Sequence, residues 1–220
     1  MNKFAIELKK YLLENGASDV GFSKAEDGLG KLNSAITIVV RLSDAIIDEI
    51  DKAPTHTYFN HYRAVNAFID SLLLKAGLFL QNKGFDYITI AASQSINDNG
   101  SEFKGRYSHK KAACLAGLGG IGKSALFIHH TFGTRVRLGT IFTNCDFEIE
   151  NAAPQNICNA CDKCVMACPA MAISGKEWDS ENPDKAIIDA AACSKHMKNA
   201  FHHIGRGAVC GICIKLCNQR

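Results

Sequence analysis

The chain has 220 residues, a formal net charge of +3, 47% hydrophobic residues and 21% charged residues. This composition is typical of an ordinary soluble globular protein, and so small a net charge does not by itself indicate a nucleic-acid partner. The charged first fifteen residues lack the apolar core of a signal peptide, and the apolar runs are short for a membrane span, so we expect a cytoplasmic protein with no membrane partner.

Helices and strands are expected to alternate over the first two thirds of the chain, on hydrophobic spacing and β-branched runs. In chain order, we expect a helix over 2–15, a short strand over 18–23, a buried strand over 34–40, a long helix over 58–82, a strand over 86–93, a helix over 109–119 and a strand over 135–144. The polar segment 94–108 is predicted to be a loop. After about residue 147 the sequence predicts short helices around cysteines.

The ten cysteines are unevenly distributed, since none precedes Cys114 and eight lie within 158–217. A reducing cytosol rarely keeps structural disulfides, so these thiols are expected to hold metal or to take part in redox chemistry. Cys114 and Cys145 stand apart and are expected to be small buried hydrophobes. The uneven distribution, with the linker-like segment 151–156, predicts two domains, 1–150 and 151–220.

Two closely spaced motifs contain most of the cysteines. They read Cys158-x2-Cys161-x2-Cys164-x3-Cys168-Pro169 and Cys210-x2-Cys213-x3-Cys217, with Cys193 between them. The first is the bacterial ferredoxin pattern, in which the fourth cysteine serves the other cluster. One [4Fe–4S] cluster is then assigned to Cys158, Cys161, Cys164 and Cys217, and the second to Cys168, Cys193, Cys210 and Cys213. A pair of zinc sites is the alternative, although zinc ligands usually come as two separated pairs.

The glycine-rich segment "GLGGIGKS" (117–124) matches both the dinucleotide-binding and the Walker A expressions. Either site needs a buried strand before the loop and a helix after it, whereas the preceding residues are basic and helix-prone. A nucleotide-binding protein, such as an ATPase with ferredoxin inserts, is therefore the weaker interpretation. The glycines are expected to let the backbone approach a bulky ligand.

The stretches "HKKAACLAGLGGIGKSALFI" and "GTRVRLGTIFTN", followed by the cysteine motifs, resemble the epoxyqueuosine reductase and reductive dehalogenase superfamily. The resemblance implies an α+β protein. Its first domain would be a nitroreductase-like α/β sandwich of the cobalamin-binding type, and its second a ferredoxin-like domain with two [4Fe–4S] clusters. Electrons would pass through the clusters to a corrinoid, or to a flavin in its place.

The resemblance also implies a set of corrinoid contacts. They are Gly117, Leu118, Gly119, Gly122, Lys123, Arg135, Arg137, Leu138, Gly139 and Thr143. Backbone amides and basic side chains suit a macrocycle fringed with amides and a phosphate tail. The alternative for Arg135 and Arg137 is that they solvate one strand face.

The chain departs from the family pattern in ways that affect the chemistry. Gly120 stands where the family loop has an aromatic residue, and the segment 92–95 has no carboxylate where the reductases place an acidic proton donor. The catalytic residue is therefore unassigned, with Tyr107 and His109 as candidate proton donors.

The sequence thus predicts an iron–sulfur oxidoreductase supplied by a redox donor such as a ferredoxin or flavodoxin. Its substrate would be a small molecule or a modified nucleoside. The tRNA-binding repeats that can follow the second cluster are missing from these 220 residues, which argues against tRNA as a partner. The alternative is a non-catalytic electron-transfer or corrinoid-handling protein.

Overall fold

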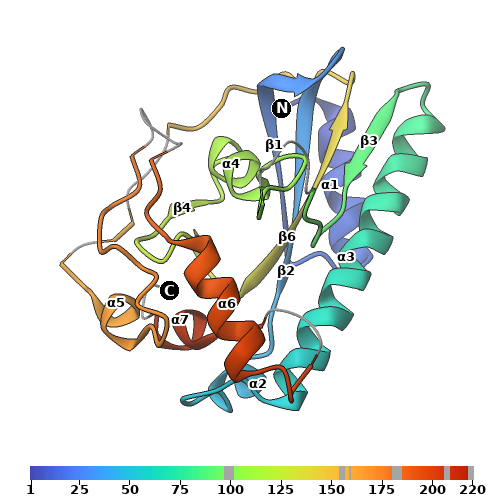
Figure 1. Ribbon diagram of the computed structural model, residues 1–220. Helices are drawn as coiled ribbons and strands as arrows, with labels where there is room; N and C mark the ends of the chain where they lie inside the picture. The colour runs from blue at the N-terminus through green and yellow to red at the C-terminus, as the bar shows by residue number, and fades with distance from the viewer. Residues whose placement is uncertain (97–101, 154–156, 159, 180–184, 206–208, 218–220) are drawn as a thin grey trace. The chain divides into compact units, whose positions relative to one another are not determined.

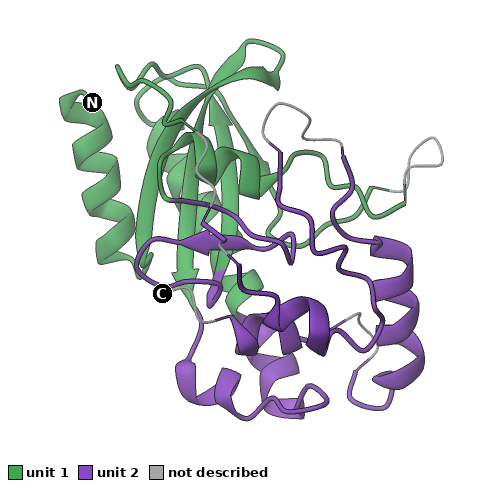
Figure 2. Cartoon of the chain, turned by 90° about the vertical axis from the view of Figure 1, so that its left-hand side faces the viewer, with its two compact units in different colours: residues 1–41, 65–118, 137–154 green, residues 42–64, 119–136, 155–220 purple. Residues whose placement is uncertain are grey.

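The computed structural model describes residues 1–96, 102–153, 157–158, 160–179, 185–205 and 209–217. These residues form two compact units, coloured separately in Figure 2. The first unit comprises Met1–Arg41, Val65–Leu118 and Arg137–Pro154, and the second comprises Leu42–Ala64, Gly119–Val136 and Gln155–Arg220. Packing thus groups the chain differently from the division into 1–150 and 151–220, which stays a prediction.

The first unit is built on a four-stranded sheet. Its strands are β1 (Asp19–Leu29), β2 (Leu32–Arg41), β3 (Tyr87–Ile90) and β6 (Val136–Thr143), in the order β1-β2-β6-β3. Strands β1 and β2 are antiparallel, and so are β3 and β6. The unit also contains α1 (Lys3–Glu14), α4 (His109–Leu115) and most of α3 (His56–Gln81), all visible in Figure 1.

Helices cover both faces of this sheet. A Cβ at Gly21 would meet Ala116 and Leu118, so the end of α4 packs on that face of β1. Phe22 points to the opposite face, because successive strand residues alternate, and it contacts Phe147 at 4.6 Å between ring centroids. Phe147 in turn stacks on Phe4 of α1. The sheet therefore has α4 on one face and α1 on the other.

Helix α3 is long and apolar enough to cross a membrane by length and composition, the one such helix among the described residues. Its apolar residues are used in the core of the first unit: Ile69, Leu72, Ala76 and Leu80 are fully buried. A Cβ at Gly139 of β6 would collide with Ile69, so the strand and the helix are in close contact. These are the features of a core helix.

The second unit contains a two-stranded hairpin and short helices. The hairpin pairs β4 (Gly119–Ile121) with β5 (Phe127–His129). The helices are α2 (Asp44–Asp48), α5 (Lys163–Ala167), α6 (Ala190–Ala200) and α7 (Ile212–Leu216). Helix α7 contacts both α5 and α2, so the second cysteine motif packs beside the first.

The α+β class is confirmed, as are the helices expected at 2–15 and 58–82 and the strands expected at 34–40 and 135–144. The strand at 18–23 runs on to Leu29, the strand at 86–93 ends at Ile90, and the helix at 109–119 ends at Leu115. Helix α2 and the β4–β5 hairpin were not expected. Part of the loop predicted at 94–108 lies outside the described residues. The nitroreductase-like and ferredoxin-like assignments stay predictions.

Candidate metal centre

The glycine-rich segment lies between a helix and a hairpin. Helix α4 ends at Leu115, Gly117 adopts a φ of +72° that favours glycine, and β4 begins at Gly119. The hairpin, rather than a helix, follows the glycines. Both nucleotide interpretations require a strand before the loop and a helix after it, so they are wrong.

The loop inside this hairpin approaches the first cysteine motif closely. A Cβ added at Gly122 would lie 3.0 Å from the Cys158 Sγ and 2.6 Å from the Ile128 Cδ1. The backbone N–H of Lys123 donates to the same Sγ at 3.3 Å. Glycine at 122 therefore leaves room for the Cys158 thiol beside the backbone, so at this residue the close approach is made by a cysteine of the first motif.

The side chain of Lys123 is also committed to the cysteine motif. Its Nζ lies 2.8 Å from Oδ1 of Asp162, which stands between Cys161 and Cys164. Lys123 is only 7% exposed, whereas the Asp162 side chain is 51% exposed. The hydrogen bond that Lys123 donates to Asp162 is the main cause that raises the pKa of Lys123. Lys123 therefore serves the cysteine segment as both a backbone donor and a cation.

Several of the remaining thiols lie close to one another. Burial first, and then the charges of Cys158 and Cys217, raise the pKa of Cys164. Burial, followed by Cys168, raises the pKa of Cys193. The pKa of Cys210 is raised by burial and then by Cys193 and Cys168. Thiols perturb each other in this way only at short range, so Cys164 lies near Cys158 and Cys217, and Cys193 and Cys210 lie near Cys168.

Cys213 has the strongest such perturbation. Burial raises its pKa to about 12, and the largest charge contributions come from Cys210 and Cys193. Cys164 of the other set contributes as well, so the two sets adjoin. Such thiols lose their protons when they bind metal, because a coordinated cysteine is a thiolate.

Within the described residues, no group of three or more His, Cys, Asp and Glu side chains is placed to hold a single metal ion. The assignment of the thiols to two [4Fe–4S] clusters stays a prediction. Backbone donors reach two of the sulfurs, from Lys123 to Cys158 and from Ala172 to Cys168 at 3.4 Å. Hydrogen bonds to sulfur are among the features that tune cluster potentials.

The predicted corrinoid contacts have partners within the protein. A Cβ at Gly119 would collide with the backbone of Ile128 across the hairpin, and Gly139 is packed against α3. Thr143 is fully buried, and Leu118 and Leu138 are each 8% exposed. Packing therefore explains the residue types at these positions without a ligand. The corrinoid contacts stay a prediction that these side chains do not themselves support.

The two arginines of the predicted set are engaged separately, one in each unit. Arg135 is 7% exposed, and its guanidinium binds Asp44 at 2.9 Å and Asp48 at 2.8 Å. The alternative that it solvates a strand face is therefore wrong. Arg137 donates from Nε to Asn66 Oδ1 at 2.8 Å and from Nη2 to the Ala92 carbonyl at 3.3 Å.

The two candidate proton donors already have partners in the first unit. His109 Nε2 donates to the Ala91 carbonyl at 3.0 Å, and its Nδ1 accepts from the Thr140 hydroxyl at 2.8 Å. Burial lowers the pKa of His109, which keeps it neutral. Burial, and then the charge of Asp27, raise the pKa of Tyr107, whose hydroxyl donates to Asp27 at 3.1 Å. Neither group is set up as an acid near neutral pH.

A carboxylate that the sequence analysis missed does reach the segment after β3. Oδ1 of Asp70 accepts the backbone N–H of Ala92 at 2.8 Å. Asp70 comes from α3, 22 residues earlier in the chain. The signal was present, because Asp70 is the one acidic residue of α3. Only the packing of α3 on the sheet brings it to Ala92.

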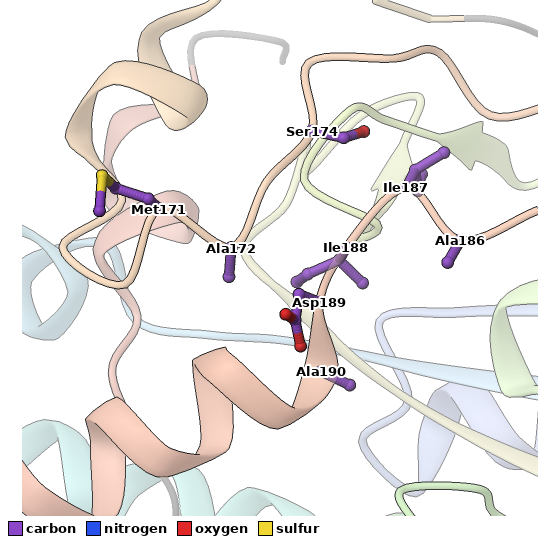
Figure 3. Close-up of a pocket in the computed structure, with 8 residues that line it drawn as sticks. All are labelled: Met171, Ala172, Ser174, Ala186, Ile187, Ile188, Asp189 and Ala190. Atoms are coloured by element: carbon purple, nitrogen blue, oxygen red, sulfur yellow. The ribbon is translucent and has the colours of Figure 1, made fainter.

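A shallow hollow of about 510 Å³ lies beside α6 in the second unit, as Figure 3 shows. Its lining is Met171, Ala172, Ser174, Ala186, Ile187, Ile188, Asp189 and Ala190. Asp189 is the one carboxylate in this lining, and it caps α6 by accepting the backbone N–H of Ala192 at 2.9 Å. The hollow therefore offers apolar contact rather than a set of reacting groups.

The two cysteines outside the motifs should resist alkylation in the folded protein. Cys114 and Cys145 are 3% and 2% exposed, and burial raises the pKa of each to about 11. At pH 8 only about one thiol in a thousand would be the reactive thiolate. Iodoacetamide at pH 8, followed by mass spectrometry, should label neither residue before unfolding and both after it. Labelling of either at its denatured rate would contradict the structure.

Curated relatives match part of the chain. An epoxyqueuosine reductase from Gloeobacter violaceus is 37% identical over 89 residues, which cover 40% of this chain and 25% of the relative. A tetrachloroethene reductive dehalogenase from Desulfitobacterium hafniense is 32% identical over 123 residues, covering 48% and 21%. The matched region thus spans about a quarter or less of these relatives. No protein-family model matches the chain.

Solved structures extend the likeness in fold to nearly the whole chain. A reductive dehalogenase studied for B12-dependent dehalogenation superposes with a TM-score of 0.69 at 21% identity, covering 97% of this chain and 31% of that one. An epoxyqueuosine reductase from Streptococcus thermophilus superposes with a TM-score of 0.59 at 19% identity, covering 100% and 66%. The chain is therefore similar to the epoxyqueuosine reductases and the reductive dehalogenases, in sequence over part of its length and in fold over nearly all of it.

Proposed function

We propose that this protein is an iron–sulfur oxidoreductase whose two [4Fe–4S] clusters relay single electrons. One cluster is bound by Cys158, Cys161, Cys164 and Cys217, and the other by Cys168, Cys193, Cys210 and Cys213. The observation that carries the proposal is the spacing of the two cysteine motifs, and it is supported by the closeness of Cys164 to Cys158 and Cys217 and of Cys193 and Cys210 to Cys168. Adjoining clusters suit a relay, because electrons can pass from one to the next.

The electrons enter from a reduced carrier such as a ferredoxin or flavodoxin in the cytoplasm, and leave to a corrinoid or a flavin that reduces a small substrate. Support for the corrinoid comes from the relatives, which include the B12-dependent dehalogenation structure. The first unit would then be the nitroreductase-like sandwich, and the cysteine-rich segment the ferredoxin-like part. We derive no reaction step through the corrinoid, because the side chains carried over as its contacts are packed or paired within the protein.

The solved relatives suggest two classes of substrate. One solved reductive dehalogenase binds 3-bromo-4-hydroxybenzoic acid, and one solved epoxyqueuosine reductase binds a modified tRNA stem loop. We propose a small molecule or a modified nucleoside rather than tRNA. The support is that the segment 92–95 has no carboxylate where the reductases place an acidic proton donor.

A second candidate function is electron transfer or corrinoid handling without catalysis. The observation that favours it is the state of the proton donors, since His109 is neutral with both ring nitrogens bonded and the Tyr107 phenol is a weaker acid than usual. Asp70 is the carboxylate that would have to serve catalysis instead.

Anaerobic reconstitution followed by spectroscopy tests the proposal. We expect about eight irons per chain, retention of hydroxocobalamin bands after desalting, and reduction of the bound corrinoid when the clusters are reduced with dithionite. About eight irons with no retained corrinoid would favour the carrier function, and the same test with a flavin would then identify the acceptor. Zinc in place of iron would overturn both candidates.

A further inference from the structure

We propose that Lys123 and Asp162 form a charge pair that sets the reduction potential of the cluster bound by Cys158, Cys161, Cys164 and Cys217. This inference rests on the proposed function, because it requires that cluster. In this role Lys123 positions the cysteine segment and supplies a positive charge beside it. Neither a phosphate site nor a corrinoid contact would explain that role.

Lys123 contacts the ligand segment at two separate points. Its backbone N–H donates to Sγ of Cys158 at 3.3 Å, and its Nζ lies 2.8 Å from Oδ1 of Asp162. Asp162 follows Cys161 directly and precedes Cys164 by two residues. One residue of the hairpin loop therefore holds both the start and the middle of the first motif.

The two members of the pair differ in their access to water. The Lys123 side chain is 9% exposed, whereas that of Asp162 is 51% exposed. Water therefore screens the lysine charge less than it screens the carboxylate. A poorly screened cation beside a cluster favours the reduced state, since reduction adds one negative charge. The Asp162 carboxylate disfavours the reduced state of the cluster, and it holds the Nζ of Lys123 in place.

The loop geometry keeps the cation where it acts. Gly122 lies in contact with both Cys158 and Ile128, so the backbone just before Lys123 is fixed against the thiol. The amide of Gly122 also donates to the Leu126 carbonyl at 2.9 Å, which closes the turn of the hairpin. Replacement of the lysine side chain therefore leaves the N–H to Cys158 in place and changes the charge alone.

Opposite shifts in two variants test the inference. Lys123→Met leaves Asp162 unpaired, so the first cluster should be harder to reduce, with at least a tenfold fall in the ratio of reduced to oxidised cluster at fixed potential, or about 59 mV for one electron. Asp162→Asn should raise the ratio of reduced to oxidised cluster at the same fixed potential. The potentials are measured by electron paramagnetic resonance during an anaerobic dithionite titration. The Cys158→Ala protein, which retains only the second cluster, identifies the unaffected signal.

Two further variants separate this role from a structural one. Lys123→Arg keeps the charge and should stay close to wild type. Lys163→Met removes a cation from the same motif, but Lys163 is exposed, so its shift should be smaller than that of Lys123→Met.

The possible outcomes distinguish the inference from the proposed function. Failure of the wild-type protein to bind about eight irons would overturn the proposed function, and the inference with it. Eight irons with the same potential in Lys123→Met, Asp162→Asn and wild type would overturn the inference alone. If Lys123→Met does not retain the first cluster, the inference depends on Asp162→Asn, and an unchanged or lower potential there overturns it.

Discussion

Replacing Cys158 with alanine is expected to halve the iron content, from about eight to about four atoms per chain. Cys158 is a ligand of the first predicted cluster only, and the ligands of the second are perturbed by one another rather than by Cys158. Loss of one thiolate should therefore release four irons and leave four. Iron analysis on anaerobically reconstituted protein measures the stoichiometry, and electron paramagnetic resonance of the reduced protein shows which signal remains.

The matched variant is Cys213→Ala, which should also bind about four irons but retain the other signal. Cys114→Ala replaces a cysteine outside both motifs and should keep about eight. If Cys158→Ala and Cys213→Ala leave the same signal, the division of the thiols into these two sets is wrong. If Cys114→Ala loses iron, that thiol is a ligand that the proposal omits.

Replacing Phe142 with alanine is expected to lower the free energy of unfolding by about 3–5 kcal/mol. Phe142 is fully buried in β6 and packs in a cluster with Leu32, Ala35 and Ile90. Its ring also meets that of Tyr107 edge-on at 4.7 Å. Truncation removes these contacts and leaves a cavity that a strand in mid-sheet cannot close. Anaerobic urea unfolding followed by far-ultraviolet circular dichroism measures the change.

Phe103→Ala provides the control for Phe142→Ala, because Phe103 is 43% exposed. Its free energy of unfolding should stay within about 0.5 kcal/mol of wild type. Equal losses in the two variants would show that β6 does not lie at the centre of the first unit. Iron content should be measured in both proteins, so that a loss of cluster is not mistaken for a loss of packing.

Much of the first unit could be predicted because its elements depend on local patterns. The run at 34–40 is rich in β-branched residues, which favours a buried strand, and β2 covers it. The spacing within 2–15 gives α1 its buried face of Ala5, Leu8 and Leu12. The cysteine motifs were equally clear, since their spacing alone suggests which thiols share a ligand set.

The rest could not be predicted because it depends on contacts between distant segments. Nothing near Lys123 in the sequence indicates Asp162, which lies 39 residues away, and the glycines around it matched two nucleotide motifs. The strands of the β4–β5 hairpin are too short to show the alternation of apolar and polar residues that predicts a strand. Arg135 looked like a ligand-binding cation because its partners Asp44 and Asp48 belong to α2, an element too short to predict.

The cysteine-rich segment shares its unit with two earlier pieces of chain, 42–64 and 119–136. A stable module that contains the cysteine motifs can therefore not be obtained by cloning from residue 155 onward. Such a fragment would lack the hairpin amide that reaches Cys158, and Thr134, whose hydroxyl donates to the Ile214 carbonyl at 3.0 Å. Transplanting the module into another scaffold would require all three pieces, joined by new connections in place of the excised sheet.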